Sequence, residues 1–388
     1  MSSEHSGADL VARAAALQPA VRAAADEADR ERRLPSAVAA AMAREGLYRV
    51  AAPRSMRGAE APPRTQIRVI ETIAEADGSA GWNLMIGIES FGLIGALFEH
   101  GAELLSDPKT IVCSATSSTG VAERVPGGYR VSGQWPFVSG CHNGDFFAGL
   151  VQVRDHGEAV PGPPVPTFAV VPRGDLEILD TWHVAGLRGS GSHDVRLDDV
   201  FVPEENLTRP PPAGTPAAAI TRVPLGVRLA YNKVGVAFGI ARAAIDAFVE
   251  LATGKVPRFS GTALRERTVA QLAVARAEVR LRGARALVFE LVDEVWERAC
   301  AGPPMSDRER AIFVVACADA VAGCAEAVDR VADAAGTTAN RLDSPLERAS
   351  RDVRVVRQHI TVASHLIEDG GRVLLGLDPR SVILAVLR

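Results

Sequence analysis

The sequence predicts an α+β protein in which a β-rich zone lies between two helical zones. Apolar residues recur at helical spacing from residue 8 to about residue 98, as in the run from Leu10 through Ala14 to Val21. From 111 to about 203, short β-rich runs alternate with glycine and proline. Helical periodicity returns after a linker at 209–218 that is rich in proline and alanine. We therefore expect an N-terminal helical domain at 1–110, a central β domain at 111–208 and a C-terminal helical domain at 209–388.

Local signals predict where several elements of the first two zones begin and end. Ser36 is expected to cap a helix that ends at Gly46. In the central zone, Gly127 and Gly128 predict a hairpin turn ahead of the strand that follows them. The proline-rich stretch at 159–167 is expected to be an exposed loop.

In the third zone, a long helix is expected from residue 225 to residue 254, and two later helices carry N-terminal signatures. Ser306 with Glu309, and Ser344 with Glu347, both have the spacing of a capping box. The residue after Ser344 is a proline, which suits the first helical position.

Composition and charge exclude several classes of protein. With 388 residues, of which 47% are hydrophobic, the chain can build a core without disulfide bonds. A net charge of -4 without a long basic run predicts no nucleic-acid partner. The most apolar stretch, 81–98, is interrupted by Asn83 and Glu89, and we expect neither a membrane-spanning helix nor a signal peptide. Five cysteines without a Cys-x-x-Cys pair predict reduced thiols in the cytoplasm and no metal site.

One strand of the central zone carries the first pattern that points to chemistry. Trp135, Phe137 and Ser139 alternate, which predicts that their side chains share one face of the strand. Such a face presents aromatic rings with a hydroxyl group at its end, a combination that suits the flat isoalloxazine ring of a flavin. On the pattern alone, a half-buried strand that ends in a Ser-Gly turn is the simpler explanation.

The second pattern lies at 180–195 and contains the glycine- and serine-rich segment 187–192. Its backbone N–H groups and hydroxyls suit a phosphate or the pyrimidine edge of a flavin, although most segments of this composition are turns. Trp182, ahead of the segment, fits a core position as well as a ligand contact. Among the histidines of this zone, only His142 lies close to Ser139 along the chain.

Together with the segment 75–82 of the first zone, these motifs resemble the acyl-CoA dehydrogenase fold, in particular its branch of two-component flavin-dependent monooxygenases. The resemblance covers nearly the whole chain. It implies a helical N-terminal domain, a small central β-barrel or sandwich, and a C-terminal four-helix bundle. In that branch the serine of the first motif lies beside flavin N5 and supports the C4a-hydroperoxide, a role that the resemblance implies for Ser139. The flavin contacts that it implies are Trp135, Phe137, Ser139, Arg188, Gly189, Ser190, Ser192 and Arg258, and the substrate-pocket residues are Trp82 and His142.

The C-terminal segment 344–376 separates two reactions that this fold supports. In acyl-CoA dehydrogenases the corresponding helix begins with an Arg-Asp pair, here Arg351 and Asp352, and many members have the catalytic glutamate where this chain has Ile360. Isoleucine has no titratable group to remove the α-proton of a thioester, so fatty acyl-CoA dehydrogenation is disfavoured. His359 stands in the Gln-His position typical of the monooxygenase branch, which implies a catalytic imidazole, although a structural histidine is the plainer alternative. We expect His359 two turns beyond Asp352 on one helix, with Ile360 in its apolar stripe.

The resemblance implies the oxygenase component of a two-component flavin-dependent monooxygenase that hydroxylates an aromatic or amine-bearing small molecule. Reduced FMN or FAD would come from a separate NAD(P)H:flavin reductase, because the chain has no Gly-x-Gly-x-x-Gly fingerprint in a βαβ context, and O2 is the other cosubstrate. The resemblance also implies a homotetramer packed through the C-terminal helices. Two alternatives stay open. One is a flavin dehydrogenase or oxidase on a non-fatty or carrier-bound substrate, which tightly bound oxidised flavin would favour. The other is a non-catalytic member of the fold that binds no flavin.

Overall fold

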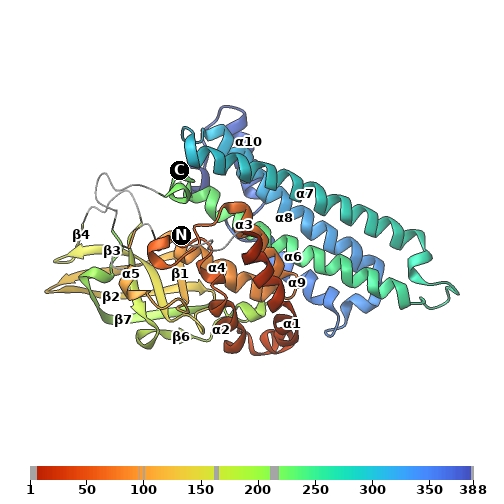
Figure 1. Ribbon diagram of the computed structural model, residues 1–388, viewed down its shortest axis with the longest axis horizontal. Helices are drawn as coiled ribbons and strands as arrows, with labels where there is room; N and C mark the ends of the chain where they lie inside the picture. Colours follow the sequence, from red (N-terminus) through yellow and green to blue (C-terminus); the bar gives the residue numbers. More distant parts are fainter. Residues whose placement is uncertain (1–6, 96, 99–100, 161–165, 210–217, 386–388) are drawn as a thin grey trace. The chain divides into compact units, whose positions relative to one another are not determined.

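The computed structural model describes residues 7–95, 97–98, 101–160, 166–209 and 218–385 (Figure 1). Most of the predicted exposed loop, 161–165, and of the predicted linker, 210–217, lies outside these residues. Helices form the first part of the chain, the described strands lie between Val112 and Pro203, and helices follow again. The predicted order of helical, β and helical zones is therefore confirmed.

The elements have the following bounds. The helices are α1 (Gly7–Glu31), α2 (Ser36–Arg44), α3 (Pro63–Ala74), α4 (Gly78–Ile94), α5 (Gly101–Leu104), α6 (Leu225–Gly254), α7 (Thr268–Ala301), α8 (Asp307–Ala335), α9 (Pro345–Arg357), α10 (His365–Leu374) and α11 (Val382–Ala385). The strands are β1 (Val112–Val125), β2 (Gly128–Val138), β3 (Phe146–Asp155), β4 (Glu158–Ala159), β5 (Phe168–Pro172), β6 (Glu177–Leu179) and β7 (His193–Pro203).

The chain divides into two compact units whose boundaries cut across the sequence. The first unit comprises the described residues of 1–61, 82–184 and 188–221, and the second comprises those of 62–81, 185–187 and 222–388. Helix α3 packs against α6 and α7 and belongs to the second unit, although it lies in the first helical zone of the sequence. The compact units therefore do not follow the sequence zones one by one.

In the first unit the described strands form a mixed sheet in the order β4-β3-β1-β2-β7-β6, and β5 pairs with β3. Strands β1 and β2 are antiparallel, with Val125 opposite Gly128, so that Pro126 and Gly127 form a two-residue turn. Gly127 has a φ of +80°, a conformation that favours glycine. The predicted hairpin is confirmed, and its second strand already begins at Gly128.

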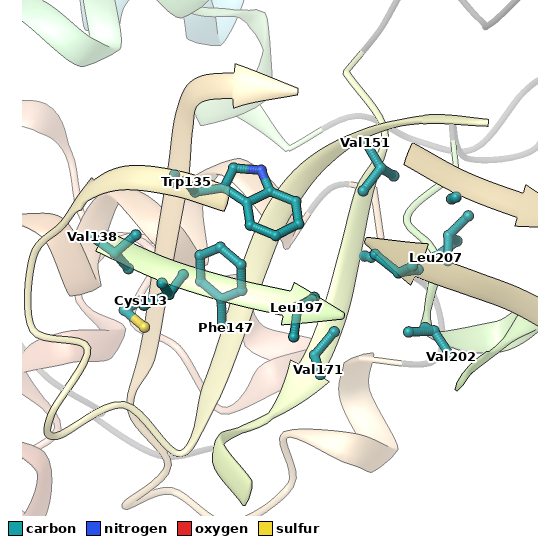
Figure 2. Close-up of a cluster of buried hydrophobic side chains, with 14 of the residues drawn as sticks. Cys113, Trp135, Val138, Phe147, Val151, Val171, Leu197, Val202 and Leu207 are labelled. Carbon is teal, nitrogen blue, oxygen red and sulfur yellow. The ribbon is translucent and has the colours of Figure 1, made fainter. Parts of the chain in front are cut away.

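The core of the sheet is built around Trp135, whose side chain is fully buried (Figure 2). The edge of its ring meets Phe147, with ring centroids 5.3 Å apart, and its Nε1 donates a hydrogen bond to the Leu150 carbonyl at 3.0 Å. A Cβ atom at Gly120 would overlap the indole ring. The glycine therefore makes the space that so large a side chain needs inside the sheet.

In the second unit, helix α8 packs against α6, α7, α9 and α10 (Figure 1). The predicted long helix is confirmed as α6. The region Asp307–Asn340 is long and apolar enough to span a membrane, but 72% of its apolar window is buried inside the structure, as in the core helix of a soluble protein. Among the described residues no other helix passes that test, and the apolar stretch 81–98 does not.

The helix ends confirm some of the predicted caps and correct others. Ser306 and its partner form the predicted capping box of α8. Ser344 makes no side-chain capping hydrogen bond, since the Glu347 amide donates to the Ser344 carbonyl at 3.1 Å and the Glu347 carboxylate pairs with Arg351, so the second capping box is wrong. Ser36 is likewise the first residue of α2 and not its cap. Gly46, with a φ of +71°, follows the end of α2 as predicted.

Candidate functional site

A β-bulge at the end of β2 decides how the first motif is presented. The register of β2 against β7 shifts between Trp135 and Val138, and Phe137 has a φ of +61°. An extra residue in one strand breaks the alternation of faces. The prediction that Trp135, Phe137 and Ser139 share a face is therefore wrong. Trp135 is 0% exposed and supports the sheet from within, whereas Phe137 is 65% exposed and meets the ring of Trp182 edge-on, with centroids 6.3 Å apart.

Ser139 is part of a chain of buried hydroxyl groups, which we call the serine cluster and which consists of Ser139, Ser190 and Ser192. Ser139 Oγ lies 2.7 Å from Ser192 Oγ, which lies 2.7 Å from Ser190 Oγ. Trp82, on α4, donates from Nε1 to Ser139 Oγ at 3.0 Å. All four side chains are buried. The hydroxyls of the serine-rich segment thus bind Ser139 and one another.

Asn83 fixes the backbone that carries two of these serines. Its Nδ2 donates to the carbonyls of Gly189 and Ser190 at 3.3 and 3.2 Å, and the Gly140 amide donates to the Ser190 carbonyl at 3.0 Å. Gly140 has a φ of +76°, and a Cβ atom there would lie 2.8 Å from Asn83 Oδ1. Sequence reasoning noted Asn83 only as a polar interruption of an apolar stretch. A side-chain amide inside an apolar stretch predicts a hydrogen-bond partner, because burying a polar group without a partner is energetically costly.

Two other predicted site residues have partners of their own. Arg188 donates from Nε to the Asp29 carbonyl at 2.9 Å and from Nη1 to the Val184 carbonyl at 3.1 Å, which ties the segment to α1. His142 is half-buried, and its ring meets that of His193 edge-on, with centroids 5.0 Å apart. Burial, and then the charge of His193, lower the pKa of His142 to about 4. His142 is therefore neutral at pH 7 and holds no extra proton to donate.

His359 lies in the second unit, beyond the end of α9. That helix ends at Arg357, so the prediction that His359 shares a helix with Asp352 is wrong. The β-branched run Ile360, Thr361 and Val362, which follows, is a poor helix former. Ile360 is 58% exposed and is not part of an apolar stripe, which corrects that prediction too.

The hydrogen bonds around His359 assign its tautomer. Thr361 Oγ1 donates its single hydrogen to the Leu229 carbonyl at 3.1 Å. The 2.9 Å contact between His359 Nδ1 and Thr361 Oγ1 then requires Nδ1 to donate. The Thr361 amide is 3.4 Å from Nδ1, a longer and weaker contact. We assign the lone pair to Nε2. Burial, and then the charge of Lys233, lower the pKa of His359 well below its usual value, so the imidazole is neutral at pH 7 and a weaker base than a free histidine.

The Arg-Asp pair of α9 holds residues 185–187. Asp352 Oδ1 accepts a hydrogen bond from the Leu187 amide at 2.6 Å, and Arg351 Nη1 donates to the Ala185 carbonyl at 2.5 Å. A Cβ atom at Gly186 would overlap the Arg351 carbonyl, so the close approach requires glycine. The pair therefore anchors residues 185–187, the last of which is the first residue of the serine-rich segment.

The structure brings together some of the predicted site residues and separates others. The serine cluster, Trp82 and Gly189 meet in the first unit, and Trp135 lies in the core of the sheet. Arg258 lies in the second unit, exposed in a turn, with its guanidinium 5.1 Å from the centre of the Phe259 ring. Its contact with a flavin phosphate stays a prediction. Within the described residues, no group of three or more His, Cys, Asp or Glu residues is arranged to hold a metal ion.

Two family models match this chain, and known proteins resemble it over most of its length. Residues 9–105 match the acyl-CoA dehydrogenase N-terminal domain, and residues 232–364 match the acyl-CoA dehydrogenase C-terminal domain. Indole-3-acetate monooxygenase from Pseudomonas putida is 32% identical, over 92% of this chain and 91% of the relative. The oxygenase component of an FADH2-dependent resorcinol hydroxylase from Rhizobium sp. is 28% identical, over 96% of this chain and 95% of the relative. The structure of XiaF from Streptomyces sp., in complex with FADH2 and glycerol, is similar with a TM-score of 0.84 at 26% identity, over 96% of each chain.

Proposed function

Since the chain is a member of the acyl-CoA dehydrogenase family, in the branch formed by the oxygenase components of flavin-dependent monooxygenases, we propose that it hydroxylates an aromatic small molecule. It uses reduced flavin and O2, and a separate reductase supplies the reduced flavin. Two relatives whose names refer to indole-3-acetate and resorcinol support an aromatic substrate, and two that are named with FADH2 support reduced FAD as the flavin.

The observation that carries this proposal is the position of Ser139 at the bulged end of β2. Its hydroxyl is held by Trp82 and Ser192 at hydrogen-bond distance, which suits a polar atom of a planar ring. Phe137, exposed on the same bulge, offers apolar surface to such a ring. We therefore propose Ser139 and Phe137 as flavin contacts. A bound reduced flavin supplies the electrons with which O2 is activated.

Proton transfer in the proposed reaction is assigned to His359. Its neutral imidazole, with the lone pair on Nε2, is the basic group that this segment offers to a phenol or a ring N–H group, and its lowered pKa makes it a weaker base than a free histidine. The neighbouring position, where the dehydrogenases of this family carry their glutamate, has an exposed isoleucine without a titratable group. The combination of a histidine with a missing carboxylate supports oxygenation over α,β-dehydrogenation.

We also propose that the protein is a cytoplasmic homotetramer that assembles through its C-terminal helices. Leu272, Val279 and Leu287 form an exposed apolar row along α7, with spacings of seven and eight residues. The described cysteines are free thiols, which supports a reducing compartment. Sedimentation should give four times the chain mass of 40.9 kDa. Val279→Glu should lower that mass, whereas Val256→Glu, at an exposed loop valine, should not.

The test of the activity is an anaerobic titration with reduced FAD and reduced FMN, followed by mixing with O2 and either indole-3-acetate or resorcinol. Hydroxylated product and hydrogen peroxide are then measured per reduced flavin consumed. Ser139→Ala should lower the product yield by about tenfold or more and release peroxide instead, because one preorganised hydrogen bond is lost. Ser55→Ala removes the hydroxyl of an exposed serine and should leave the yield unchanged.

Two results would contradict the proposed activity. Tight binding of oxidised flavin, with flavin reduction by substrate and no oxygen incorporated, would indicate a dehydrogenase. Failure to bind either flavin in either redox state would indicate a non-catalytic member of the family.

A further inference from the structure

The end of helix α1 carries an arginine in a backbone conformation that favours glycine. The helix ends at Glu31, and Arg32, the next residue, has a φ of +54°. The Arg33 amide donates to the Ala28 carbonyl at 3.3 Å, which is the hydrogen bond of a Schellman helix end. Glycine adopts the left-handed conformation at such an end without steric cost, whereas a residue with a Cβ atom is strained there. Strain of this kind is kept where the side chain has a use, and the contacts of Arg32 show which segment it serves.

The Arg32 guanidinium binds the first residues of the motif at 180–195. Nη1 and Nη2 donate to the two carboxylate oxygens of Asp180 at 2.6 and 3.1 Å, which makes a bidentate pair. Nη1 also donates to the Trp182 carbonyl at 3.2 Å. A guanidinium group can only donate, so the direction of all three hydrogen bonds is fixed. One side chain therefore holds residues 180–182 against the end of α1.

Trp182 in turn supports the exposed ring of the proposed flavin site. Its side chain is buried, and its ring meets that of Phe137 with centroids 6.3 Å apart and planes 81° apart. Phe137 is itself strained, with a φ of +61°. Ser117 Oγ donates to the Pro136 carbonyl at 2.8 Å and so holds the backbone just before Phe137. The indole of Trp182 is the aromatic surface against which the ring of Phe137 is placed.

The ion pair of Arg32 is poorly placed to stabilise the fold. The Asp180 side chain is 64% exposed, and an ion pair with so exposed a partner contributes little to stability. The planar fork of a guanidinium group nevertheless restricts the direction of its partners more than a single charge does. The three hydrogen bonds of Arg32 therefore contribute more to the orientation of Trp182 than to the free energy of folding.

We propose that Arg32 is a positioning residue of the flavin site, which acts through Trp182 by holding the indole where it supports Phe137. The inference rests on the proposed function, because Phe137 is a flavin contact only under that proposal. Without Arg32, residues 180–182 lose three hydrogen bonds to the end of α1, and the Phe137 ring has to be ordered when flavin binds. Ordering one side chain on binding lowers affinity by about fivefold.

Arg32→Gly separates positioning from stability. Glycine suits the left-handed backbone, so the urea midpoint should not fall below that of the wild type. The dissociation constant of reduced FAD, measured anaerobically, should rise about fivefold. Arg57→Gly is the matched control, because Arg57 is also an exposed arginine with a φ of +56°, and it should leave the dissociation constant unchanged. A lower midpoint for Arg32→Gly, or an unchanged dissociation constant while Phe137→Ala raises it, would overturn the proposal.

A second pair of measurements tests whether Arg32 acts through Trp182. In a Trp182→Leu background, Arg32→Gly should change the dissociation constant of reduced FAD by less than about twofold, and a full fivefold loss there would show that the arginine acts independently. Acrylamide quenching of tryptophan fluorescence needs no flavin. Arg32→Gly should raise this quenching in the wild-type background but not with Trp182→Leu, and unchanged quenching would overturn the proposal. If Phe137→Ala leaves the affinity for reduced FAD unchanged while the quenching differs as expected, the flavin contact has failed and the positioning of Trp182 has not.

Discussion

Replacing Asp352 with alanine tests how the serine-rich segment is anchored. The Asp352 side chain is buried, and its Oδ1 accepts a hydrogen bond from the Leu187 amide at 2.6 Å. A Cβ atom at Gly78, the first residue of α4, would lie 3.1 Å from Oδ2, so the second oxygen faces the N-terminus of that helix. The carboxylate therefore binds a buried amide and also lies at the positive end of a helix dipole.

These two interactions determine the expected magnitude. A hydrogen bond to a charged group contributes about 1.5–3 kcal/mol to stability. A carboxylate at a helix N-terminus contributes about 0.3–1 kcal/mol. Asp352→Ala should therefore lower the free energy of unfolding by about 2–4 kcal/mol. Asp352→Asn keeps an acceptor but loses the charge, and it should lie between the alanine variant and the wild type.

Urea unfolding at pH 7, followed by circular dichroism, measures these differences. Asp343→Ala is the matched control, because Asp343 pairs with Arg341 at 2.8 Å while both side chains are more than two thirds exposed. A surface ion pair of this kind contributes little, so the control should be indistinguishable from the wild type. If Asp352→Ala were no less stable than Asp343→Ala, the reasoning from burial and charge would be refuted.

Three further predictions follow from the helix ends, the half-buried His142 and the tautomer of His359. Ser306→Ala removes a capping box and should cost about 1 kcal/mol in urea unfolding, whereas Ser344→Ala should be neutral, and equal losses would contradict the assigned caps. The pKa of His142 lies near 4 in the folded protein and near 6.5 in the unfolded chain, so the unfolded state binds more protons between these pH values. The free energy of unfolding should therefore fall as the pH drops from 6.5 to 4. His142→Asn should flatten this fall in acid titrations, and an unchanged slope would contradict the assigned pKa of His142. Thr361→Val should lower kcat/KM by about tenfold and change its pH profile, because His359 Nδ1 loses the acceptor that selects its tautomer. Thr361→Ser should restore both the rate and the pH profile. A Thr361→Val enzyme with normal kinetics would contradict the tautomer assigned to His359.

Much of the architecture could be predicted from local patterns in the sequence. Three such patterns depend only on residues close together in the chain: helical periodicity, the capping box at Ser306 and the glycine of the β1–β2 turn. They can therefore be predicted without knowing the fold. The two motifs around Ser139 and at 180–195 were sufficient to predict the family. A titratable group is either present or absent at residue 360, so the loss of the glutamate could also be predicted directly.

The tertiary structure alone decided how those residues are used. The alternation of Trp135 with Phe137 predicted a shared face, but pairing with β7 introduces a bulge that sends one ring into the core and exposes the other. The serine cluster joins one hydroxyl just after β2 and two from the segment before β7 to an indole from α4, and no spacing in the sequence encodes their distances. Short-range patterns follow from the geometry of the backbone, which is the same in every protein. Strand register and long-range hydrogen bonds follow from which segments pack together, and only the folded chain determines that.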